Sequence, residues 1–133
     1  MKKQMNGYGP HLMLDLDECN PKILDDLEAC FKLLNELPEK IGMTRITQPY
    51  IFRYMAPIPE DEGITGAVII AESHISIHTY PKKRFVFVDL FSCKPFDTEM
   101  ARDYIVQFFE SNCPVSHIQE RGVAFPRSIR LAS

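Results

Sequence analysis

The chain has 133 residues, of which 45% are hydrophobic and 25% charged, and its formal net charge at pH 7 is -3. These values are typical of one globular domain with a buried core, so we expect a single domain over residues 1–133. No window approaches the ~20 apolar residues of a membrane span, and the lysines and arginines are scattered, so neither a membrane nor a nucleic acid is an expected partner. The N-terminal residues lack the apolar core of a signal peptide, which predicts a cytoplasmic protein.

The cysteines, Cys19, Cys30, Cys93 and Cys113, include no C-x-x-C pair. This spacing disfavours a zinc ribbon and a thioredoxin-like redox motif. Isolated cysteines in a reducing compartment usually behave as small hydrophobic residues, so the spacing alone predicts four buried thiols.

The first third of the chain predicts a strand, a helix and a second strand. Residues 10–16 alternate partly with period two, as on a strand with one face in the core. Asn20 and Pro21 supply an N-cap and a first helical position, and apolar residues then recur at helical spacing until the helix ends before Pro38. Residues 44–52 are rich in β-branched and aromatic residues but contain a proline, which favours a strand at a sheet edge or with a bulge.

The middle of the chain predicts three more strands. Residues 56–63 form a loop that is rich in proline and acidic residues. An apolar run at 64–71 and an alternating segment at 75–77 follow, and a turn at 80–84 leads into a further strand at 85–93. This succession is typical of a hairpin or meander.

The last third predicts a helix, a short strand and an irregular tail. Asp97 caps an amphipathic helix that stops at Asn112 and Pro114, and residues 115–120 form the strand. The element order is therefore β-α-β-β-β-β-α-β. Strands grouped between two helices predict an α+β fold, a two-layer sandwich in which an antiparallel sheet carries both helices on one face.

The open face of this sheet is expected to carry Phe85, Phe87 and Phe91. An aromatic patch of this size on a sheet face predicts a partner subunit. We therefore expect a homodimer in which the open faces pack together.

Polar residues interrupt the central strands and invite a metal-site interpretation. His74 and His78 are four residues apart on a strand, so they share one face with Ser76. His11 or His117 would be a third ligand. Tetrahedral zinc needs three or four convergent ligands, however, and the sequence shows no companion spacing.

A hydrolase triad is a second interpretation of the same segment. Ser73, His78 and Asp89 supply the three residue types. The G-x-S-x-G elbow and any oxyanion-hole signature are missing. Polar residues on a half-solvated strand would also explain this pattern without any chemistry.

The segment Ala71–Pro81 reads A-E-S-H-I-S-I-H-T-Y-P, and Val88–Cys93 reads V-D-L-F-S-C. These segments resemble the prokaryotic S-adenosylmethionine decarboxylase family, whose members carry E-S-H-x-x-I-H-[ST]-[WFY]-P and then D-[VIL]-[FY]-[ST]-C. The offsets from serine to histidine (78 − 73 = 5) and from serine to cysteine (93 − 73 = 20) match without a gap. Gly63–Gly66 also fits the family's G-x-[ST]-G, and the resemblance covers roughly residues 8–110.

The resemblance implies a decarboxylase that makes its own pyruvoyl cofactor from a serine, without a metal. Applied to this sequence, the resemblance implies a chain break between Glu72 and Ser73. The break would leave a β chain of residues 1–72 and an α chain of residues 73–133, which is 133 − 72 = 61 residues long. The implied activity converts S-adenosylmethionine to the aminopropyl donor for spermidine biosynthesis.

The resemblance also implies separate roles for three further residues. His78 matches the histidine that accepts a proton during processing, a task suited to imidazole. Thr65 occupies the hydroxyl position that supports the tetrahedral intermediate. Cys93 matches the acid that returns a proton to the substrate Cα, after the pyruvoyl carbonyl has bound the substrate amine as a Schiff base.

The substrate-binding residues depart from the family pattern. Glu72 is expected to contact substrate, but Lys82 stands where the family has a glutamate that binds the ribose diol, and lysine has only donors. The loop before Gly63 is also longer and brings Glu60, Asp61 and Glu62, which suit either a cationic substrate or a solvated turn.

Two alternatives therefore stay open beside S-adenosylmethionine decarboxylase. One is a pyruvoyl-dependent arginine or ornithine decarboxylase on the same fold. The other is an unprocessed homologue that acts as a regulatory or binding partner, against which the retention of Ser73, His78 and Cys93 argues.

Strand alternation conflicts with a single compact site. It places Ser73 on one face of its strand and His78 on the other, although the implied chemistry needs both at one carbonyl. A bulge, or backbone strain beside the scissile bond, would reconcile the two.

Overall fold

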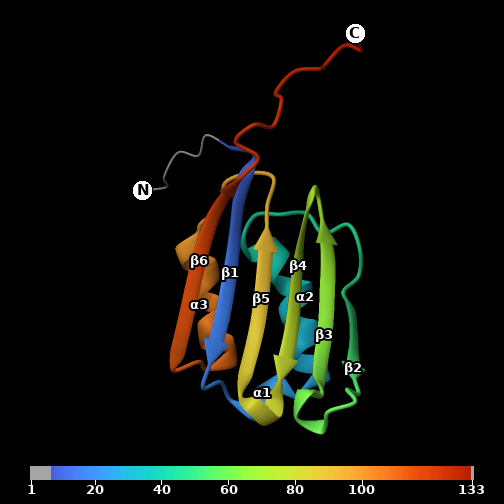
Figure 1. Ribbon diagram of the computed structural model, residues 1–133, viewed down its shortest axis with the longest axis vertical. Helices are drawn as coiled ribbons and strands as arrows, with labels where there is room; N and C mark the ends of the chain where they lie inside the picture. Colours follow the sequence, from blue (N-terminus) through green and yellow to red (C-terminus); the bar gives the residue numbers. More distant parts are fainter. Residues whose placement is uncertain (1–6, 133) are drawn as a thin grey trace.

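A computed structural model describes residues 7–132, which form one antiparallel sheet with the strand order β2-β3-β4-β5-β1-β6 (Figure 1). The strands are β1 (Gly9–Asp17), β2 (Tyr50–Tyr54), β3 (Gly63–Ile70), β4 (Ser73–Tyr80), β5 (Phe85–Phe91) and β6 (Cys113–Arg121). The helices are α1 (Pro21–Leu24), α2 (Leu27–Lys40) and α3 (Thr98–Phe109), with single 3-10 turns at η1 (Pro59–Asp61) and η2 (Pro81–Lys83). None of these helices, within the described residues, is long and apolar enough to cross a membrane.

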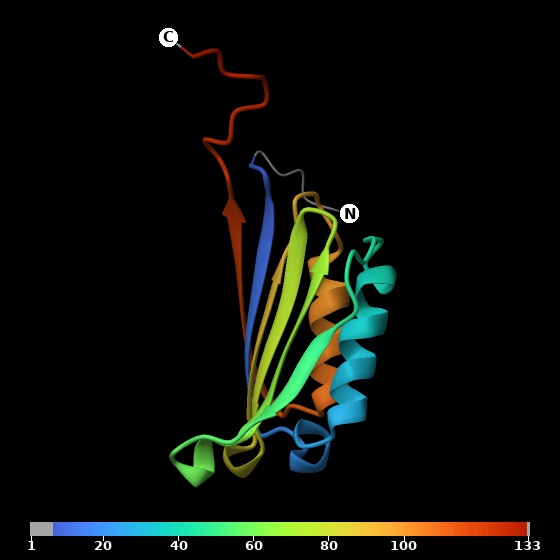
Figure 2. The same ribbon diagram turned by 90° about the vertical axis from the view of Figure 1, so that its right-hand side faces the viewer.

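Helices α2 and α3 cover one face of the sheet, and the described residues place no helix over the other (Figure 2). The predicted α+β two-layer sandwich is therefore confirmed. Alternate strand residues point toward the helices and are buried because they are aliphatic: Leu12, Leu14, Leu16, Ile64, Val68, Ile75, Ile77, Val86, Val88 and Leu90. They pack on Leu33, Leu34 and Leu37 of α2 and on Ala101, Ile105 and Phe109 of α3.

The side chains of the remaining strand residues lie on the open face of the sheet. Phe87 is 41% exposed, and Phe85 and Phe91 are half-buried, in a strand whose intervening Val86 and Val88 are buried. The predicted aromatic face is therefore present on β5.

The single helix predicted from Pro21 to before Pro38 is wrong in two respects. The chain leaves the helix after Leu24, and the Asp26 side chain accepts a hydrogen bond from Ala29 N (3.0 Å), which caps α2 as a separate helix. Helix α2 then continues past Pro38 to Lys40, since a proline in the last turn removes one backbone hydrogen bond without ending the helix.

The strand predicted over residues 44–52 is also shorter than expected. Only Tyr50–Tyr54 pairs with β3, and Arg45 makes an isolated bridge to Ile70. The edge position predicted from Pro49 is confirmed, because β2 ends the sheet. At the opposite edge β6 extends the predicted strand at 115–120, and residues 122–132 run away from the sheet (Figure 1).

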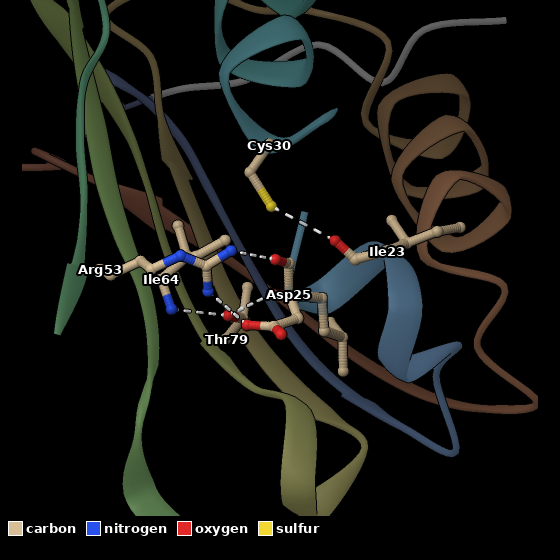
Figure 3. Close-up of polar contacts among 7 residues, drawn as sticks. Ile23, Asp25, Cys30, Arg53, Ile64 and Thr79 are labelled. Carbon is tan, nitrogen blue, oxygen red and sulfur yellow. Dashed lines mark hydrogen bonds and ion pairs between the residues drawn. The ribbon is translucent and has the colours of Figure 1, made fainter. Parts of the chain in front are cut away.

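The Thr79 side chain points to the helix side of the sheet and connects β4 to α1. Its Oγ1 donates to the carbonyl oxygen of Leu24 (2.7 Å) and accepts from Ile64 N (2.9 Å). Figure 3 shows this contact beside the ion pair of Arg53 with Asp25 (2.5 Å). Because Thr79 is fixed inward, its neighbour His78 is held on the open face.

Candidate active site

The β3–β4 hairpin ends in a two-residue turn, Ala71–Glu72, between the paired residues Ile70 and Ser73. Glu72 has a φ of +59°, in the left-handed region that is uncommon for residues other than glycine. A left-handed residue is thus present beside the predicted cleavage bond, but it does not bring Ser73 and His78 to one face of β4. The alternative of a bulge is wrong, because β4 pairs in continuous register with both neighbours.

Ser73 and Cys93 meet at this turn. Ser73 is 7% exposed, and its Oγ accepts a hydrogen bond from Cys93 N (2.8 Å). The Cys93 thiol donates to the carbonyl oxygen of Ala71 (3.6 Å). Glu72, Ser73 and Cys93 therefore form one group, which we call the serine cluster.

Tyr8, in the N-terminal segment, contacts the serine cluster through Glu72. Its hydroxyl donates to Glu72 Oε2 (3.0 Å), and its ring stacks on Phe91, with centroids 6.0 Å apart, and contacts Phe125 at 4.5 Å. Desolvation and the Glu72 carboxylate raise the pKa of Tyr8, so the hydroxyl keeps its proton at neutral pH. Sequence reasoning missed Tyr8, because nothing local links it to a residue 64 positions away.

Tyr8 also shows which side of the sheet Glu72 borders. Phe91, on which Tyr8 stacks, lies on the open face beside the rings of His11 and His74. The Glu72 carboxylate therefore lies on the open-face side of the hairpin, although the Ser73 side chain points toward the helices.

Thr65 and His78 form a second group on the open face. They are register partners on β3 and β4, with Thr65 Oγ1 3.4 Å from His78 Nδ1. His78 lies five positions after Ser73 on an extended strand, so roughly 17 Å separates the two residues along β4. One protomer therefore does not bring the predicted processing residues together.

A cavity of about 1040 Å³ opens beside Thr65 and His78. Its volume is at the upper end of those found for small-molecule sites. Its walls are largely aromatic, with two carboxylates and one ammonium group: Phe52, Tyr54, Tyr80, Phe85 and Phe87, with Asp17, Asp61 and Lys83.

Lys82 does not line this cavity. It borders a separate hollow with Asp25, Glu28 and Arg53. The next residue, Lys83, lines the cavity instead, and its Nζ lies 2.5 Å from Asp61 Oδ1. That hydrogen bond raises the pKa of the Lys83 ammonium group, so Lys83 keeps its positive charge at neutral pH.

The structure does not assemble the metal or hydrolase sites considered from sequence. His74 and His78 share a face, but residues 7–132 contain no group of three metal-ligating side chains. Asp89 pairs with His11 (Oδ1 to Nε2, 3.1 Å), and Ser73 faces away from His78, so the Ser73, His78 and Asp89 triad does not form.

The other three cysteines differ in burial. Cys19 and Cys30 are buried as predicted, and desolvation raises their pKa values to about 11 and about 12, so both thiols stay neutral. The prediction of burial is wrong for Cys113, which is exposed because it lies on the edge strand β6.

The fold and the serine cluster define an α+β protein with a hydroxyl and a thiol at a hairpin turn. Among known proteins, the S-adenosylmethionine decarboxylase family matches residues 10–122. The chain therefore belongs to the S-adenosylmethionine decarboxylase family.

Individual relatives agree with this assignment. The chain is 38% identical over 128 residues to the S-adenosylmethionine decarboxylase proenzyme of Thermodesulfovibrio yellowstonii, covering 96% of this chain and 90% of the relative. It is 32% identical over 122 residues to the Pyrococcus abyssi proenzyme, covering 90% and 82%. The crystal structure of the Aquifex aeolicus adenosylmethionine decarboxylase superposes with a TM-score of 0.77 at 28% identity, covering 93% of this chain and 98% of that one.

Proposed function

We propose that this chain is a proenzyme that cleaves itself between Glu72 and Ser73 and then decarboxylates S-adenosylmethionine. The observation that carries the proposal is the serine cluster: the Ser73 hydroxyl lies at a turn whose preceding residue is left-handed, and the Cys93 thiol is beside it. Cleavage would leave residues 1–72 and 73–133 as the two chains of one protomer.

The Ser73 hydroxyl is the nucleophile of the proposed cleavage. Its Oγ attacks the Glu72 carbonyl carbon, the peptide C–N bond breaks, and the chains are then joined by an ester. A base removes the Ser73 Cα proton so that the ester leaves as the Glu72 carboxylate, and water releases ammonia from the remaining α chain terminus. The left-handed Glu72 favours this route, since breaking its peptide relieves backbone strain.

The residues of the serine cluster fit a pyruvoyl group at position 73. The Cys93 N–H that binds Ser73 Oγ would donate to a carbonyl oxygen there. When present, a pyruvoyl group supplies an electrophilic carbonyl that binds the substrate amine and accepts electrons as carbon dioxide leaves. The Cys93 thiol would return a proton to the substrate Cα.

A homodimer would complete the site, because Thr65 and His78 lie far from Ser73 within one protomer. The Glu72 side chain, Thr65 and His78 all border the open face. A two-fold axis between two open faces, running across the strands, reverses the partner's strand direction. Such a dimer lays the Thr65 and His78 pair of one protomer over the serine cluster of the other, where His78 accepts the Cα proton.

The cavity beside His78 supports a nucleoside substrate. Aromatic side chains line it, and aromatic rings provide faces on which a purine base stacks. The Asp17 carboxylate suits the positive charge of a sulfonium group. The proposed product is decarboxylated S-adenosylmethionine, the aminopropyl donor for spermidine.

Release of labelled carbon dioxide tests the substrate. Purified protein is incubated side by side with carboxyl-labelled S-adenosylmethionine, ornithine and arginine. We expect release from S-adenosylmethionine, and none from Ser73→Ala. Release from arginine or ornithine alone would overturn the proposed substrate, and no release from any of the three would overturn the proposed activity.

A further inference from the structure

The chain has no carboxylate at position 82 to bind a ribose, and the lysine there does not reach the cavity. Lys82 borders the hollow formed with α1 and α2 instead. A vicinal diol is bound most strongly by a charged acceptor, which the neutral aromatic and hydroxyl side chains of the cavity wall do not supply. A carboxylate elsewhere in the wall is therefore expected to bind the diol if a nucleoside binds there, which rests on the function proposed above.

The longer acidic loop brings such an acceptor into the wall. Turn η1 packs beside η2, and Asp61 at the end of η1 lines the cavity with a side chain 33% exposed. Its neighbours Glu60 and Glu62 do not line the cavity. Only one of the three acids of this loop thus lines the cavity.

Lys83 fixes Asp61 without saturating it. The ammonium group occupies Oδ1 at 2.5 Å, and a carboxylate offers about four lone-pair sites in all. Among residues 7–132, Lys83 is the only side chain that hydrogen-bonds Asp61. The pair therefore presents an oxygen acceptor beside an ammonium donor, which matches two adjacent hydroxyl groups.

Asp17 is the other carboxylate of the cavity. Its Oδ1 accepts a hydrogen bond from Glu18 N (2.8 Å) at the end of β1. Within residues 7–132 no ammonium group is paired with Asp17, so its carboxylate offers acceptors only. Asp17 thus serves as the competing candidate in a test.

We propose that Asp61, held by Lys83, binds the ribose diol of the substrate in place of the carboxylate missing at position 82. The loop that lengthens the chain before Gly63 is then a specificity element. Loss of the diol contact should weaken binding about tenfold or more, as expected for a hydrogen bond to a charged group.

Binding of two nucleosides to purified full-length protein tests this proposal independently of turnover. Calorimetry compares 5′-methylthioadenosine with its 2′,3′-dideoxy analogue. The wild type should prefer the ribonucleoside, Asp61→Asn should lose that preference, and Asp61→Glu should recover part of it. The exposed Glu60→Gln, on the same turn, is the matched control and should keep the wild-type preference.

Several outcomes would overturn the assignment. The first is a wild type that binds the ribonucleoside no more tightly than its dideoxy analogue. The second is an Asp61→Asn variant that keeps the wild-type preference. The third is loss of this preference in Asp17→Asn but not in Asp61→Asn. Failure of the proposed function looks different, since the wild type would then release no carbon dioxide from S-adenosylmethionine. In turnover assays Asp61→Asn should raise KM with little change in kcat, whereas a folding defect would lower the cleaved fraction on a gel.

Discussion

The Glu72 side chain is contacted from outside the hairpin. Tyr8 binds its carboxylate, and the Tyr8 ring is in turn packed between Phe91 and Phe125. We expect this contact to help position the Glu72 carbonyl carbon for attack by the Ser73 hydroxyl. Tyr8 is therefore predicted to be a positioning residue for the proposed cleavage.

Tyr8→Phe should slow self-cleavage about 2- to 10-fold, the rate equivalent of a net hydrogen bond of roughly 0.5–1.5 kcal/mol. A gel time course of the freshly purified precursor measures the rate. Tyr50→Phe, at an exposed tyrosine of β2, should cleave at the wild-type rate. Equal cleavage rates for Tyr8→Phe and the wild type would contradict this role. It would also be contradicted if Glu72→Gln slowed cleavage of the Tyr8→Phe variant by the same factor as it slows the wild type.

The residues of the candidate site could be singled out where a local pattern encodes them. The motifs point to Ser73, His78, Cys93 and Thr65, whose roles stay predictions, and alternation correctly separated Ser73 from His78. Tyr8 and the orientation of Lys82 were not predictable, because they depend on packing between distant segments. Cys113 was misassigned because edge exposure follows from strand order, which the sequence pattern does not give.

At the scale of elements, two glycines of the G-x-[ST]-G motif set the spacing around Thr65. A Cβ on Gly63 would lie 1.8 Å from the carbonyl oxygen of Thr79, on the neighbouring strand. A Cβ on Gly66 would lie 2.8 Å from Leu34 Cδ1 of α2. The first glycine lets β3 and β4 pair, and the second lets α2 pack on the sheet.

Gly66→Ala should lower the free energy of unfolding by about 1–3 kcal/mol, because Leu34 must leave its packed rotamer. Denaturant unfolding of the uncleavable Ser73→Ala background measures this loss. Leu34→Val removes the contacting methyl group, so the two substitutions together should cost less than their sum. Additive losses would show that the Leu34 contact is not the cause.

The elements themselves were largely predictable from period-two and helical patterns, and the predicted N-caps Asn20 and Asp97 are confirmed. The break between α1 and α2 was missed because apolar spacing continues through it. The late start of β2 was missed because β-propensity indicates which residues suit a strand, while pairing with β3 decides where one forms.

At the scale of the whole molecule, the serine cluster lies far from the Thr65 and His78 pair within one protomer. This separation predicts that two inactive variants can complement each other in a mixed dimer. Differently tagged Ser73→Ala and His78→Ala chains are co-expressed and the mixed dimer is isolated. We expect the His78→Ala chain to be cleaved, because the Ser73→Ala partner supplies the histidine. Each variant alone should stay uncut or cleave much more slowly.

Failure of the mixed dimer to cleave, with both variants folded, would contradict a site shared across the open faces. Cleavage of the Ser73→Ala chain would contradict the assignment of the nucleophile. A protein that stays monomeric at all concentrations in sedimentation would contradict the dimer itself.

Intact mass spectrometry of the purified protein tests the self-cleavage most directly. We predict two chains that divide between Glu72 and Ser73, with the second chain lighter by one ammonia than a chain beginning with serine, and a single intact chain for Ser73→Ala. A single full-length mass for the wild type after prolonged incubation, or a second chain that begins with unmodified serine, would contradict the proposal that this chain makes its own cofactor.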